Sequence, residues 1–260
     1  MDRWISLVAG LLLFLPLTAR ADTSIVLPFP GQGSPASPNL ERGHLSAKTQ
    51  RVVRAAVAAA RGGREAATAS EGVIRKAMAA GDKAGTVRGY DALDVPGDDG
   101  AACLYRGRVI HGRATGLGVM RCRSQIFVGR FRDGRLNGLG GDTALLTADA
   151  YEGEYRNGAR MGYGIERDKD GVYPGQYGFR ADGKKTDLEI LGLQDFKDAH
   201  WAGHFGIYSG PKIACTLIKG AVLEGSVLDG DGAKFDSRGH LIEQGFYKLG
   251  VLENGSGPPC

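Results

Sequence analysis

The sequence lacks most of the signatures that mark an enzyme or a metal protein. It contains neither a CxxC pair nor an HExxH motif, which excludes the usual zinc sites. The glycine-rich run from Gly178 to Lys185 approaches a phosphate-binding loop, but Lys185 stands where that loop needs a serine or threonine. His200 and His204 occupy a strand-like stretch, where their spacing corresponds to about 13 Å, too far to share a metal. We therefore predict no cofactor and no metal.

Long apolar runs are equally scarce. The one run, from Ile5 to Leu17, is too short to span a bilayer comfortably and is interrupted by Pro16. It follows a short charged lead and precedes small residues, which is the arrangement of a cleavable secretory signal over residues 1–21. We expect the mature chain to begin at Asp22 and to be soluble and exported, in the periplasm or outside the cell.

Cysteine is also sparse, but the four residues form an even number, and export favours disulfides. A hairpin that turns just after Gly112 would place Cys103 directly opposite Cys122, at a separation that a disulfide accepts. Cys215 and Cys260 would then form a second pair and hold the C-terminal tail against the rest of the chain. The alternative is two pairs of free thiols.

The N-terminal part has little apolar bulk. Residues 22–46 are rich in proline, glycine and serine and are typical of a flexible linker. Residues 47–89 form a basic, alanine-rich segment of strong helix formers. Gly62-Gly63 resembles a helix C-cap, so we expect helices over 47–61 and 64–80 that pack weakly or stay mobile. Residues 90–102 are expected to form an acidic loop.

What the chain has in abundance is glycine, with 30 of its 42 glycines beyond residue 102. The stretch from Tyr151 to Gly164 reads YEGEYRNGARMGYG. Its first aromatic residue is followed by glycine two, seven, eleven and thirteen positions later. The same spacing begins at Phe127 and at Tyr105. Copies 24 and 22 residues apart indicate a repeat array.

Each copy has the pattern of a β-hairpin. Tyr151, Gly153 and Tyr155 alternate with charged residues, as in a half-buried strand, and Asn157-Gly158 supplies the turn. An isolated hairpin is marginally stable, so successive hairpins must stack and bury one continuous face. We predict a mainly β fold, an elongated single-layer antiparallel β-meander of hairpin repeats preceded by a short α-helical segment.

The YxGxxxxGxxxGxG spacing resembles that of MORN (membrane occupation and recognition nexus) repeats. The clearest copies begin at residues 105, 127, 151 and 173, and degenerate copies begin at 201 and 223, so the array would occupy residues 103–260. The resemblance implies an elongated array of β-hairpins that serves in binding and assembly.

The repeat aromatics have two alternative roles. They either pack on the repeat glycines as the core or form a ligand-binding platform. Because every repeat must bury something, we favour the core. The residues concerned are Tyr105, Phe127, Phe131, Tyr151, Tyr155, Tyr173, Tyr177, Trp201 and Phe205.

Strand alternation places arginines on the face opposite the aromatics. If Leu104 pairs with Arg121, six arginines share that face over the first two repeats. They are Arg106, Arg108, Arg121, Arg123, Arg130 and Arg132. The face then changes sign at Glu152 and Glu154. The functional interpretation is a docking surface for an anionic partner, and the alternative is a solvated face that keeps the array soluble.

The sequence favours a non-enzymatic, exported interaction or scaffold module that presents its β-repeat surface to a protein or to an anionic component of the cell envelope. The alternative is an envelope-acting hydrolase whose site is assembled from residues distant in sequence. We expect no nucleic-acid partner. Peripheral contact with a membrane and self-association through exposed end strands are both compatible with the sequence.

Overall fold

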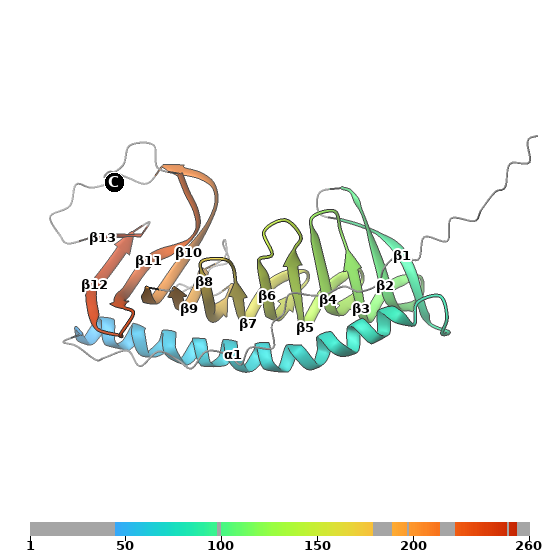
Figure 1. Ribbon diagram of the computed structural model, residues 1–260, viewed down its shortest axis with the longest axis horizontal. Helices are drawn as coiled ribbons and strands as arrows, with labels where there is room; N and C mark the ends of the chain where they lie inside the picture. Colours follow the sequence, from blue (N-terminus) through green and yellow to red (C-terminus); the bar gives the residue numbers. More distant parts are fainter. Residues whose placement is uncertain are drawn as a thin grey trace, which may run out of the picture.

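The computed structural model describes residues 45–97, 100–178, 189–196, 198–213, 222–248 and 250–253. Within these residues, one helix is followed by a single antiparallel sheet of 13 strands, in which each strand pairs with the next in sequence order. The sheet does not close, because β1 and β13 each have one neighbour. The molecule is an elongated array with the helix running along it (Figure 1). The predicted fold class is confirmed.

Helix α1 spans Ala47–Asp82. The strands follow as β1 (Tyr90–Pro96), β2 (Ala102–Ile110), β3 (Arg113–Arg121), β4 (Gln125–Arg132), β5 (Arg135–Ala144), β6 (Ala150–Arg156), β7 (Ala159–Arg167), β8 (Gly171–Tyr177), β9 (Glu189–Phe196), β10 (Ala199–Ile213), β11 (Val222–Asp236), β12 (Leu241–Lys248) and β13 (Val251–Leu252).

Two-residue turns close the repeat hairpins where the sequence predicted them. The turn at Asp133-Gly134 has φ angles of 50° and 84°, and the turn at Asn157-Gly158 has φ angles of 51° and 86°. Positive φ at both positions is the geometry whose twist matches that of the flanking strands. Asparagine, aspartate and glycine tolerate this conformation best, which is why these dipeptides specify the hairpins.

The first hairpin turns one residue earlier than predicted. His111 and Gly112 occupy its turn, with φ angles of 50° and 71°. A register shift between Gly107 and Val109 of β2 then restores the predicted pairing of Leu104 with Arg121. The bulge therefore compensates for the displaced turn.

The repeat aromatics form the core, as predicted. Seven are buried, namely Tyr105, Phe131, Tyr151, Tyr155, Tyr173, Tyr177 and Phe205. Phe127 and Trp201 are partly buried against the same cluster. Rings of neighbouring repeats meet edge to face, with centroids 5.1 Å apart for Tyr105 on β2 and Phe131 on β4. The repeat glycines make room for these rings, since a Cβ added at Gly118 would lie 2.6 Å from the Tyr105 ring.

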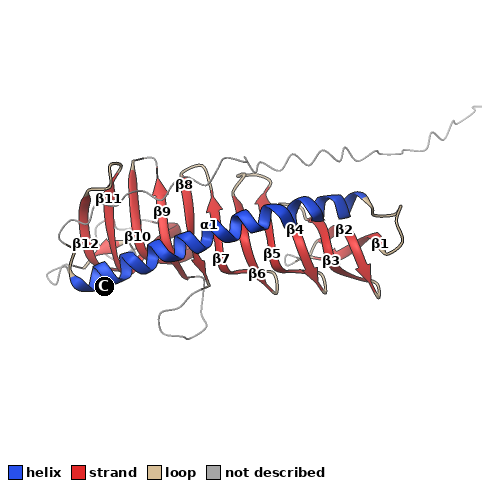
Figure 2. Ribbon diagram, turned by 90° about the horizontal axis from the view of Figure 1, so that it is seen from below, coloured by secondary structure: helices blue, strands red, loops and turns tan. Residues whose placement is uncertain are grey.

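Helix α1 covers the opposite face of the sheet. It crosses the strands along the length of the array (Figure 2) and contacts every strand from β1 to β11. Ile74 and Ala77 pack against apolar side chains of β3 and β4, including Val119 and Val128. With 36 residues, the helix is about 54 Å long. Among the described residues, no helix combines the length and apolar character that crossing a membrane requires.

The predicted break at Gly62-Gly63 is wrong, and so is the expectation of weak packing. Both glycines lie inside the continuous helix. A Cβ added at Gly63 would lie 2.7 Å from the backbone nitrogen of Gly175, and one added at Gly62 would lie 2.7 Å from the Tyr163 ring. These glycines therefore mark the closest approach of helix and sheet instead of a helix end.

The acidic loop expected over residues 90–102 is also wrong in part. Its first seven residues form β1, which pairs with β2 from Tyr90 opposite Arg108 to Pro96 opposite Ala102. Leu93 packs against the aromatic core and gives this edge strand an apolar anchor. At the other end, the degenerate copies continue the same sheet through β10, β11 and β12.

A disulfide joins Cys103 to Cys122 across the open end of the first repeat hairpin, as predicted. Cys215 and Cys260 lie outside the described residues, so their pairing stays a prediction. The same holds for the secretory signal over residues 1–21 and for residues 22–44 of the linker.

Candidate interaction surface

Two of the predicted arginines, Arg106 and Arg130, lie on the helix side of the sheet, and that face is not open. Arg106 pairs with Val119, and Arg130 pairs with Leu117. Both partner residues belong to the apolar cluster beneath α1. For these two residues the inference that the arginines face away from the aromatics is right, whereas the inference of a fully accessible face is wrong. Only the strand segments beyond the helix are accessible.

Arg106 supports the helix and is only partly exposed. Its Nε atom lies 3.4 Å from the carbonyl oxygen of Gly81, in the last turn of α1. A cation is favourable at this position because the carbonyl groups of the last helical turn carry partial negative charge. We therefore assign Arg106 to the packing of α1 on the sheet.

Three other arginines line one groove at the turn ends of the first two repeat hairpins. Arg108, Arg130 and Arg132 are exposed and border a depression of about 520 Å³. The remaining lining residues are Tyr90, Ile110, Thr115, Gly116, Leu117, Phe131 and Asn137. We call this depression the arginine groove.

A repeat glycine lies against two of the groove arginines, Arg108 and Arg130. The nearest atoms to a Cβ added at Gly116 belong to Arg108, with Cδ at 3.0 Å and Cβ at 3.2 Å. At Gly138 the nearest atom is Cδ of Arg130, at 3.7 Å. The stem of each arginine thus lies against the glycine eight positions later, on the returning strand. Arg108 and Arg130 thus occupy equivalent positions in a row across the two hairpins.

The third repeat ends the basic row. Glu154 occupies the position equivalent to Arg108 and Arg130, and its Oε2 accepts a hydrogen bond from the backbone nitrogen of Tyr163 at 2.8 Å. Glu152, predicted to contribute to the same change of sign, is buried and bonded to Arg167 at 2.6 Å. The third repeat therefore has an acid where the first two have Arg108 and Arg130, although it keeps an exposed arginine, Arg156, at the position equivalent to Arg132.

The groove arginines have no acidic partner within the described part of the chain. The nearest ion pair joins Arg113 to Asp133 at the adjacent turns, with both side chains largely exposed. Lys83 adds a further positive charge, 5.4 Å from the centroid of the Tyr90 ring. A row of uncompensated guanidinium groups gives the groove a positive potential that attracts anions.

Arg121 and Arg123 are exposed but do not belong to the groove. Arg121 ends β3, five residues after Gly116, which corresponds to about 17 Å along the strand. Arg123 lies in the connection between β3 and β4. The six predicted residues therefore divide into three in the groove, one beneath the helix end and two at the opposite ends of the strands.

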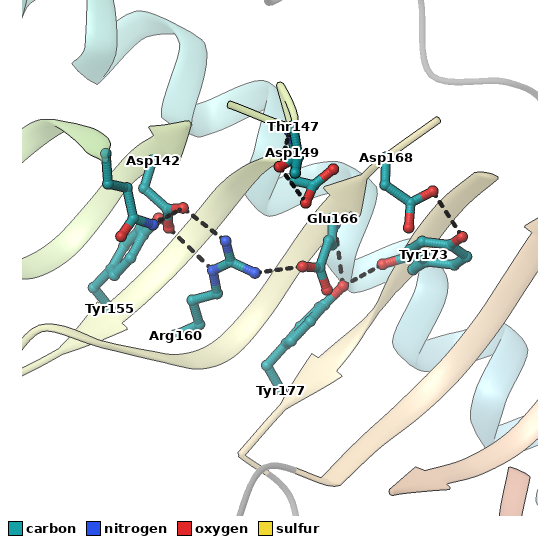
Figure 3. Close-up of polar contacts among 10 residues, drawn as sticks. Asp142, Thr147, Asp149, Tyr155, Arg160, Glu166, Asp168, Tyr173 and Tyr177 are labelled. Carbon is teal, nitrogen blue, oxygen red and sulfur yellow. Dashed lines mark hydrogen bonds and ion pairs between the residues drawn. The ribbon is translucent and has the colours of Figure 1, made fainter. Parts of the chain in front are cut away.

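The aromatic side carries a second charged cluster, which the sequence did not reveal. Arg160 lies between two acids: Nη2 is 2.6 Å from Oδ1 of Asp142, and Nη1 is 2.6 Å from Oε1 of Glu166 (Figure 3). Tyr155 donates a hydrogen bond of 2.5 Å to Asp142. Burial alone would lower the pKa of Arg160, but Asp142 and Glu166 outweigh it and raise that pKa.

The charged and polar groups of this cluster bond to one another, so we assign the cluster to the support of the fold. Asp142 is only 2% exposed and accepts a further hydrogen bond of 2.8 Å from Gln125. The guanidinium of Arg160 stacks 4.9 Å from the centroid of the Tyr151 ring. The chain thus inserts a buried ion network where the first repeat has the apolar side chains of Val109, Ala114 and Met120.

Metal-ligating side chains do not cluster in the described residues. No group of three or more His, Cys, Asp and Glu side chains within them is placed to hold a metal ion. His200 and His204 lie on β10, and Nδ1 of His200 is 3.1 Å from Asp195, which also contacts Arg64 of α1 at 3.2 Å. This contact links the helix to the sheet.

A protein-family model for the MORN repeat matches residues 105–125, 127–140 and 151–173. The chain carries MORN repeats. The matched segments coincide with the hairpins β2–β3, β4–β5 and β6–β7 and extend into β8. No curated protein matches the chain. The arginine groove lies on the first two MORN repeats, and the buried ion network lies on the second and third.

Proposed function

We propose that this MORN-repeat chain is a non-enzymatic binding or scaffold module that docks a negatively charged partner in the arginine groove. MORN repeats generally form binding or scaffold domains and are typically non-catalytic. The observation that carries the proposal is the convergence of Arg108, Arg130 and Arg132 on one groove without an acidic partner among the described residues. The stems of Arg108 and Arg130 lie on repeat glycines, so these two side chains need little ordering on binding.

The partner in this proposal belongs to the cell envelope, because residues 1–21 have the arrangement of a secretory signal. Expression of the full-length chain tests the location. The mature protein should begin at Asp22 by intact-mass measurement and should fractionate with periplasmic or extracellular material. A cytoplasmic protein that retains Met1 would overturn the exported part of the proposal.

Affinity capture from envelope extracts tests the docking site. The groove variant is Arg108→Glu with Arg130→Glu, and the matched control is Arg121→Glu with Arg123→Glu, which changes the net charge equally. Capture of an anionic partner should be lost in the groove variant and retained in the control. Equal loss in both variants would mean that net charge, and not the groove, drives binding. Melting curves should show that both variants are folded.

A further inference from the structure

The shape and lining of the arginine groove indicate which kind of anion it takes. We infer that the groove binds an extended acidic segment of a partner protein, an inference that rests on the proposed function. The carboxylates of this segment are two or three residues apart, with apolar side chains between them. The inference depends on the spacing of the cations and on the apolar floor that separates them.

The cations are spaced as the carboxylates of an extended chain would be. Arg108 lies on β2 and Arg130 on β4, two strands apart, so their backbones are separated by about 10 Å. Arg130 and Arg132 are two residues apart on β4, which corresponds to about 7 Å. An extended peptide advances about 3.3 Å per residue, so acids three residues apart match the separation across the strands and acids two residues apart match the separation along β4. The two separations run at right angles, so a straight segment matches one of them at a time.

The floor between the cations is apolar. Ile110 is 38% exposed, and Leu117 is partly buried between the strands that carry Arg108 and Arg130. An apolar side chain between two carboxylates would cover this surface and gain from its burial. A free oxyanion has no apolar group that could cover this floor, and a layer of lipid headgroups presents only polar groups to it. The floor therefore favours a peptide over either anion.

Polar side chains at the edges of the groove can form hydrogen bonds with a peptide backbone. Thr115 and Asn137 border the groove on β3 and β5 and carry both hydrogen-bond donors and acceptors. Arginine forms paired hydrogen bonds with carboxylates because its planar guanidinium matches their geometry. The groove crosses from β1 to β5, which corresponds to about 19 Å, or about six residues of an extended chain.

Fluorescence anisotropy with defined peptides tests this inference. The probe is a labelled peptide of about ten residues with aspartate at every third position and valine between. One comparison peptide gathers the same aspartates at one end, and another replaces them with asparagine. Inorganic phosphate and phosphatidylglycerol vesicles are the competing anions. Each is measured against the wild type, the Arg108→Glu, Arg130→Glu variant and the Arg121→Glu, Arg123→Glu control.

The spaced peptide should bind the wild type and the control alike, and the groove variant should bind it at least about tenfold more weakly. The gathered and asparagine peptides should bind more weakly than the spaced one. The inference is overturned if the gathered peptide binds equally well, or if phosphate or vesicles bind in a groove-dependent way and the spaced peptide does not. Groove-dependent capture from envelope extracts would then still uphold the proposed function, so the two failures are distinguishable.

Discussion

The buried ion network predicts a large and specific response to the loss of Arg160. In Arg160→Leu the side chain becomes the one that the preceding repeat has at the equivalent position, Leu136, so the size and shape suit the fold. Asp142, only 2% exposed, then loses two hydrogen bonds, of 2.6 and 3.0 Å. It keeps donors from Tyr155 and Gln125 but no compensating charge.

Removing one partner of a buried ion pair costs about 3–5 kcal/mol. The two remaining donors place Arg160→Leu at the lower end, near 3 kcal/mol by the same principle. For an array of this size, a loss of about 1 kcal/mol lowers the melting temperature by about 2–4 °C, so the variant should melt about 6–12 °C below the wild type. Chemical denaturation followed by circular dichroism measures the free energy, and thermal melting gives the second reading.

A four-residue replacement provides the control. Asp142→Met, Tyr155→Phe, Arg160→Leu and Glu166→Met together install residues that other repeats carry at the same positions, such as Met120. Replacing a complete buried network by packed apolar groups is often neutral or stabilising, so this variant should recover to within about 1 kcal/mol of the wild type. A loss below about 1 kcal/mol for Arg160→Leu would refute the reasoning. So would a fourfold variant less stable than the single one.

Gly63→Ala should lower the free energy of unfolding by about 1–3 kcal/mol, because the added Cβ atom meets the sheet backbone. Gly72→Ala should raise it by about 0.8–1 kcal/mol, because its added Cβ atom has no other atom within 4 Å and alanine favours the helix more than glycine does. Urea denaturation of the two variants should therefore show opposite signs. Burial raises the pKa of Glu152 above that of a glutamate in the unfolded chain. Glu152 therefore contributes to stability while it is protonated, below about pH 4, and this contribution is lost as the pH rises through the raised pKa. The wild type should therefore lose stability relative to Glu152→Gln between about pH 4 and about pH 7, as measured by the free energies of unfolding of the two proteins. A relative gain of stability by the wild type over this range would contradict the raised pKa. Replacing Cys103 and Cys122 by alanine should cost about 3 kcal/mol, and a reductant should then lower the melting temperature of the wild type but not of the variant.

The hairpins could be predicted because their determinants are local. A dipeptide such as Asn157-Gly158 specifies its turn without reference to the rest of the chain, and the spacing to Tyr151 then fixes which residues face each other. The pairing of Cys103 with Cys122 follows from the same register. The aromatic core follows as well, because rings such as Tyr105 and Tyr151 each have a glycine on the neighbouring strand to pack against.

The helix and the groove could not be predicted, because both depend on contacts between distant segments. Gly63 resembles a helix cap in sequence, and only the sheet backbone beside it shows why a glycine is needed inside the helix. Strand alternation grouped Arg108 with Arg121 but could not show that α1 would cover the face between them. Tyr90 belongs to the groove only because an acidic segment joined the sheet as β1.

Hydrogen–deuterium exchange of the mature protein with and without its captured partner tests the location of the docking site most directly. Binding in the arginine groove should slow exchange at the turn ends of the first two hairpins, over residues 108–117 and 130–137, and leave α1 and the third repeat unchanged. Protection on the third repeat or along α1, with none at the groove, would contradict docking at Arg108, Arg130 and Arg132.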